Sequence, residues 1–137
     1  MVGYLEAVAT YLNSKGVVAY PATAVATWPC FIHSWAATPD AVVCLYPRPG
    51  RESIDAFGGK RIRSPEMHIE VRGSPQGTPA AFNKMCEIGD ALHNVGGITV
   101  NGIDIIVIRA LGEVSNLGRD DKNRSIFSQN FVVKILC

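Results

Sequence analysis

Strict alternation of apolar and polar residues predicts two half-buried β-strands. Over residues 66–72, Met67, Ile69 and Val71 alternate with polar side chains, so one face belongs to a core and the other is wet or an interface. A longer strand over residues 125–135 places its apolar residues on one face: Phe127, Phe131, Val133 and Ile135. Its opposite face is polar, with Ser128, Asn130 and Lys134.

A period near 3.6 predicts two helices. Over residues 2–15, Leu5, Val8 and Leu12 recur at helical spacing, and Gly16 is placed to end the helix. The second helix runs from Thr78, as the N-cap before Pro79, to about Asn94, with Gly96-Gly97 as its terminator. Its predicted buried stripe consists of Phe82, Met85, Cys86, Gly89 and Leu92.

The remaining segments complete an α+β pattern. Residues 41–46 are apolar on both faces, as in a central strand, and Pro47 to Gly50 should stop it. Residues 98–100 and 103–109 read as two strands joined by a tight turn, whereas 17–40 should be irregular or hold one short strand. We therefore expect one domain over 1–137, with a single mixed or antiparallel β-sheet and two α-helices packed on one face.

Charge gathers in two exposed segments. Residues 51–64 carry six charged residues and Gly58-Gly59, which predicts an extended hairpin arm or a mobile loop, about 48–64 in all. Residues 119–124 hold five charges in six positions. Because unpaired charges are costly to bury, we expect this turn at the surface.

Composition narrows the functional class. Hydrophobic residues make up 47% of the chain, which excludes global disorder. Thirteen basic against twelve acidic residues leave no net field that would attract nucleic acid or an anionic membrane. The first residues lack the pattern of a signal peptide and no apolar stretch is long enough to span a bilayer, so we expect synthesis in a reducing cytoplasm.

Candidate chemistry is sparse. Cys30 and His33 have the spacing of a zinc half-site, with Cys44 as a third ligand, but a second close pair is absent, which favours a buried cysteine beside an incidental histidine. His68 lies between two glutamates that should raise its pKa, which suits a solvated salt-bridge ladder as well as acid–base work. His93 should interact with the last carbonyls of its helix. We expect no catalytic residue and no cofactor.

What remains is a contact surface. A mixed-sign arm suits self-association, in which basic groups of one copy meet acidic groups of the next. The candidate contact residues, toward a second subunit or another partner, are Arg48, Arg51, Lys60, Arg61, Arg63, Glu70, Arg72, Arg119, Asp120 and Arg124.

The chain resembles the small minor capsid family of tailed bacteriophages, whose members are similar to tail terminator or tail completion proteins. Short motifs carry the resemblance, in order: residues 45–50 (LYPRPG), 64–65 with 69–73 (IEVRG), 88–93 (IGDALH), and 117–120 (LGRD) with Arg124 and Asn130-Phe131. The positions that match these motifs include Pro49, Gly50, Pro65, Arg72, Gly118, Arg119, Asp120, Arg124, Asn130 and Phe131. The aromatic stretch from Pro21 to Trp35 departs from the pattern.

This resemblance implies a structural virion protein without cofactor: a homohexameric ring at the tail–neck junction that caps the tail tube. Its partners would be itself, the tail tube protein and a neck or head-completion protein, without membrane or sequence-specific nucleic acid. A head-closure or neck adaptor is the alternative within this class. From another class, a small metal-binding domain would use Cys30, His33 and Cys44.

Overall fold

The computed structural model describes residues 3–21, 27–34, 39–55 and 57–136. Parts of the stretch from Pro21 to Trp35, and the side chains of residues 51–57, including Arg51, lie outside the described part. In chain order the elements are α1 (Tyr4–Ser14), β1 (Cys30–Ile32), β2 (Val42–Asp55), the 3-10 turn η1 (Phe57–Gly59), β3 (Arg61–Arg72), α2 (Thr78–Leu92), β4 (Gly96–Val100), β5 (Ile103–Arg119) and β6 (Ser125–Leu136).

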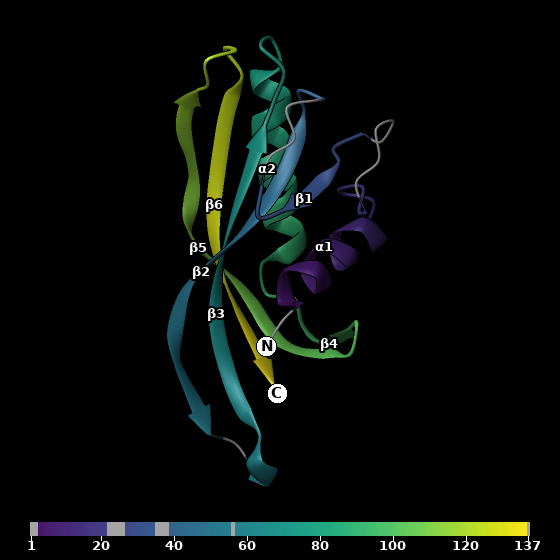
Figure 1. Ribbon diagram of the computed structural model, residues 1–137, viewed down its shortest axis with the longest axis vertical. Helices are drawn as coiled ribbons and strands as arrows, with labels where there is room; N and C mark the ends of the chain where they lie inside the picture. The colour runs from purple at the N-terminus through teal and green to yellow at the C-terminus, as the bar shows by residue number, and fades with distance from the viewer. Residues whose placement is uncertain (1–2, 22–26, 35–38, 56, 137) are drawn as a thin grey trace.

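The strands form one curled, mixed sheet in the order β1-β2-β3-β6-β5-β4, in which β1 and β2 are parallel and the other pairs antiparallel. Both helices lie on the same side of it (Figure 1). The predicted fold class, α+β with two helices on one face, is therefore confirmed. No helix in the described ranges is long and apolar enough to cross a membrane.

The core lies between the helices and the sheet. Leu5, Val8 and Leu12 of α1 are buried, as the periodicity predicts. On α2 the buried residues are Ala81, Met85, Ile88 and Leu92. The predicted buried stripe was wrong at Phe82, which is 44% exposed. The helix is rotated so that the row of residues 81, 85, 88 and 92 faces β6 and β3 instead.

Two strands are longer than their patterns predict. Pro47 to Gly50 do not stop β2, which continues to Asp55. Beyond Leu45 this strand pairs with β3 alone in the described part, and an edge strand tolerates proline because fewer ladder bonds are lost. Likewise β5 reaches Arg119, with three register shifts along its pairing with β6.

The exposed segment after Tyr46 is a hairpin arm rather than a loop. The far halves of β2 and β3 pair with each other as far as Asp55 and Arg61, and η1 closes the tip. The arm projects beyond the core, away from α2 (Figure 1). At its base the two backbones are close: a Cβ on Gly50 would lie 2.1 Å from the Ser64 carbonyl oxygen.

The expected second-helix boundaries also change. The helix ends at Leu92, and Gly96-Gly97 belong to β4 rather than to a helix stop. The ring of His93 does not bind the helix carbonyls; its Nδ1 accepts the backbone N–H of Ala110 at 3.2 Å. This contact ties the end of α2 to β5.

Candidate functional site: charged cluster, arm and groove

A polar row crosses the sheet face that lies opposite the helices. Tyr46, His68 and Asn130 are in register on β2, β3 and β6. The His68 ring bonds on both sides, Nδ1 to Asn130 Oδ1 at 2.7 Å and Nε2 to Glu70 Oε2 at 2.9 Å. The Glu70 contact raises the pKa of His68 despite partial burial, as expected of one flanking carboxylate. Each nitrogen is thus held by a neighbour within the subunit.

Not every polar residue of this face is exposed. Ser128 lies on the same face, beside Glu70 in register, yet it is only 4% exposed. Asn130 and Lys134, which the alternation also places on the polar face of the last strand, are half-exposed.

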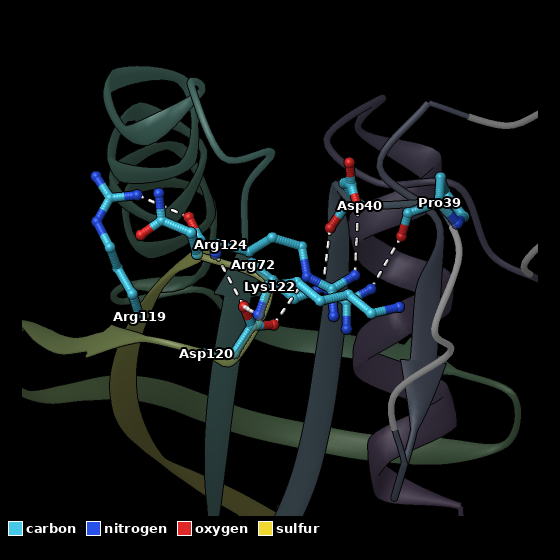
Figure 2. A network of polar contacts seen from close by, with 8 residues as sticks. Pro39, Asp40, Arg72, Arg119, Asp120, Lys122 and Arg124 are labelled. Atoms are coloured by element: carbon cyan, nitrogen blue, oxygen red, sulfur yellow. Dashed lines mark hydrogen bonds and ion pairs between the residues drawn. The ribbon is translucent and has the colours of Figure 1, made fainter.

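At one end of this face the charged turn folds into a network, which we call the Arg124 cluster: Pro39, Asp40, Arg72, Asp120 and Arg124 (Figure 2). Arg124 donates from Nε to Asp120 Oδ2 at 2.8 Å and from Nη1 to Asp40 Oδ1 at 3.2 Å. Arg72 donates to the Asp40 and Pro39 carbonyl oxygens, each at 2.9 Å. The cluster joins the β5–β6 turn, the end of β3 and the segment before β2.

Two of its charges are buried, although most of the turn lies at the surface as expected. Arg72 is 4% and Arg124 5% exposed. Burial is tolerated because carboxylates and carbonyls accept from the guanidinium groups. The pKa of Arg72 is lowered, first by desolvation and then by the nearby Arg124. Desolvation alone would raise the pKa of Asp120, but hydrogen bonds from Arg124 and from the Lys122 amide lower it on balance.

Arg119 remains exposed but also has partners within the subunit. Its guanidinium donates to the carbonyl oxygens of Pro75 and Asn123 and to the Thr78 hydroxyl, at 2.8 to 3.2 Å. Thr78 was predicted to be the N-cap of α2, but it is the first residue of the helix. Gly77 occupies the N-cap position and makes no side-chain capping hydrogen bond. Arg119 instead fastens the turn to the start of α2.

The arm carries an excess of basic charge. Arg48, Lys60 and Arg61 are exposed and Arg63 is half-buried. Among the side chains that the structure describes, none of these four forms an ion pair. Residues 48–64 contain five basic and two acidic residues, so the arm has an excess of three positive charges.

A groove of about 400 Å³ lies between α2 and β5. Its lining includes Gly89, Gly112 and Val114, and its floor is Gln129, which is 8% exposed and donates to the Gly112 carbonyl oxygen at 2.9 Å. The exposed carboxylates of Asp90 and Glu113 also line it. Sequence reasoning missed this groove, because it depends on the register shift between Leu111 and Ser115.

The residues of the alternative metal-site reading do not form a metal site in the described part of the chain. Cys30 and Cys44 are buried on adjacent strands, and burial raises the pKa of Cys30 to about 12 and of Cys44 to about 11, so both are neutral thiols. His33 is exposed. In the part of the chain that is described, no three potential ligands lie together as a metal site.

Comparison with family models identifies a family, and comparison with solved structures identifies similar folds. A model of the family described as bacteriophage tail terminator protein matches residues 11–136. A chain from the virion of a native gene transfer agent particle is similar in fold, with a TM-score of 0.65 and 16% identity over 98% of this chain and 95% of that one. A second solved chain gives 0.56 and 18% over 94% and 92%. No curated protein matches the sequence.

Proposed function

The chain belongs to the bacteriophage tail terminator family and has a structural role in the tail of a virion, and from this premise we propose that it forms a homohexameric ring. The ring caps the tail tube at the tail–neck junction and joins the tail to the neck or head-completion protein. It acts by contact alone, with no catalytic residue and no cofactor. We propose that the subunit is made in the host cytoplasm.

The observation that carries this proposal is the match to the family over residues 11–136. The placement of charge supports it. The projecting arm has an excess of three positive charges over residues 48–64, and Arg48, Lys60 and Arg61 are exposed on it. A heterologous contact, in which one surface meets a different surface of the next copy, closes into a ring when the rotation between copies allows it.

Within this proposal the ten candidate contact residues divide into two groups. On the arm, Arg48, Lys60 and Arg61 are exposed. The second group has hydrogen-bond partners inside the subunit and therefore stabilises the contact surface: Glu70, Arg72, Asp120 and Arg124. We propose that the turn they hold, with the exposed Arg119 beside it, faces the neighbouring subunit or the neck.

Electron microscopy of particles made without this protein tests the function. Overlong tails, or tails detached from heads, are expected if it ends and joins the tube. Normal tails with heads that leak their contents would instead support the head-closure or neck adaptor. Elemental analysis of the purified protein addresses the metal-binding alternative, which stoichiometric zinc would revive.

Two variants test the surfaces. Deleting Ser53 to Arg61 shortens the arm, and we expect fewer rings and fewer joined tails at unchanged solubility. Arg119→Ala with Asp120→Ala should lower tail joining, because the turn loses its anchor to the Thr78 hydroxyl and its internal hydrogen bonds. Full-length, joined tails from either variant would show that the altered surface is not a contact.

A further inference from the structure

The arm and the groove are complementary in charge. Residues 48–64 have an excess of three positive charges, and neither Asp90 nor Glu113 forms an ion pair among the side chains that the structure describes. The arm points away from α2, so it does not fill the groove of its own subunit (Figure 1). We propose that the arm of one subunit docks in the groove between α2 and β5 of the next subunit.

The size of the arm fits this role. Eight residues of β2, from Arg48 to Asp55, extend about 26 Å at the usual rise of a strand. That length is sufficient to reach from one subunit across the surface of a neighbour. A groove of about 400 Å³ takes only a few side chains, so it fits the tip of the arm around Lys60 and Arg61 rather than the whole two-stranded ribbon.

Exposed apolar side chains on the same two elements provide a second, independent argument. Phe82 of α2 is 44% exposed and Leu117 of β5 is 51% exposed; with Ile106 they are the large hydrophobic residues of the described part that face solvent. The ring of Phe82 rests edge-on against Phe127 at 5.5 Å, so it is held in position rather than free. Exposed apolar side chains beside a groove are typical of a surface that another chain covers.

Charge complementarity favours a second copy of this chain as the molecule that binds in the groove. The ammonium of Lys60 and the guanidinium of Arg61 lie near the arm tip, and the carboxylates of Asp90 and Glu113 line the groove. The arm also carries Ile54, Phe57 and Ile62 in sequence, so it combines positive charge with apolar residues. A second copy of this chain therefore supplies both kinds of side chain that the groove and its surroundings require.

This docking rests on the proposed ring, and a zero-length carbodiimide cross-link on assembled tails tests it. Carbodiimide activates a carboxylate, and the amine of Lys60 displaces the activating group to form an amide, with loss of one water equivalent as the urea by-product. We expect mass spectrometry to find Lys60 joined to Asp90 or Glu113 in species of dimer mass and above. Lys60→Arg should abolish the cross-link, since a guanidinium is a poor nucleophile. Lys60 joined only to the tube protein or to another surface would overturn the docking.

Charge reversal provides the second arm of the test. Lys60→Glu with Arg61→Glu, and separately Asp90→Lys with Glu113→Lys, should each weaken subunit association at least about tenfold, and the combination of all four should restore it. The matched control is Asp104→Lys, an exposed carboxylate whose described hydrogen-bond partner is Thr99, and it should leave association unchanged. Association unaffected by both reversals, with intact rings, would refute the docking while the ring itself stands. Absence of rings from wild-type tails would refute the proposed function.

Discussion

Replacing Arg124 by methionine should lower the free energy of unfolding by more than substitutions in a charged surface turn usually do. Methionine keeps most of the apolar stem but removes the donors to Asp120 and Asp40. Arg124 is 5% exposed, so the Nε–H bond to a carboxylate falls in the class of charge-assisted hydrogen bonds worth about 1.5–3 kcal/mol. The bond to Asp40 adds little, about 0.5 kcal/mol, because that carboxylate is 49% exposed.

One effect acts in the opposite direction. Arg72 and Arg124 lie close enough for the second to lower the pKa of the first, so losing one cation relieves a repulsion. The two hydrogen bonds together contribute about 2–3.5 kcal/mol, and the relieved repulsion brings the net loss in the free energy of unfolding to about 2 kcal/mol, the lower end of that range. For a domain of this size, that corresponds to a fall in melting temperature of roughly 6–10 °C.

Urea unfolding followed by circular dichroism measures this loss, with Lys122→Ala as the control. Lys122 lies in the same turn, is exposed and also contributes one positive charge, yet its substitution should change stability by less than about 0.5 kcal/mol. The pKa of Asp120 is lowered in the folded state, so the stabilisation is present above the unfolded pKa of the carboxyl group and is lost as pH falls through the folded value. Equal midpoints for Arg124→Met and wild type at pH 7 would refute the reasoning.

Two further predictions concern the arm and the polar row. In Gly50→Ala, the new Cβ would lie 2.1 Å from the Ser64 carbonyl oxygen, a backbone atom, so the arm strands must separate; hydrogen exchange should show lost protection in the arm and unchanged protection in β6. Glu70→Gln should lower the pKa of His68 in an NMR titration, since the Glu70 contact raises it. Wild type should then lose stability relative to that variant as pH rises from about 6.5 through the raised pKa, and an unmoved pKa would contradict the assignment.

Periodicity predicted the elements that bury one clean face. The alternation at Met67, Ile69 and Val71, and the helical spacing of Leu5, Val8 and Leu12, both correspond to fully or nearly fully buried residues. It failed where tertiary pairing overrides local preference. Pro47 looks like a strand stop, but pairing with β3 carries the strand past it, and the register shifts that extend β5 have no local signature.

The site was less predictable than the fold, because it depends on hydrogen bonds between charged side chains and acceptors that lie far apart in the sequence. Sequence showed charged residues in the turn but not that Asp40, far away in sequence, accepts from Arg124. The groove was missed altogether, since Asp90 and Glu113 come from different elements and no pattern joins them. The basic arm, in contrast, was visible in sequence as a cluster of charges around two glycines.

The two arginines at the ends of strand β3 have different roles because their surroundings differ. Arg61 begins it and Arg72 ends it, separated by a strand of 12 residues. At the Arg72 end, Pro39 and Asp40 supply carbonyl acceptors, so the guanidinium is buried and stabilises the fold. At the Arg61 end the described residues supply no acidic partner, so the charge stays exposed. Substitutions at Arg72 should therefore lower stability and assembly together, whereas substitutions at Arg61 should lower assembly without changing the melting temperature.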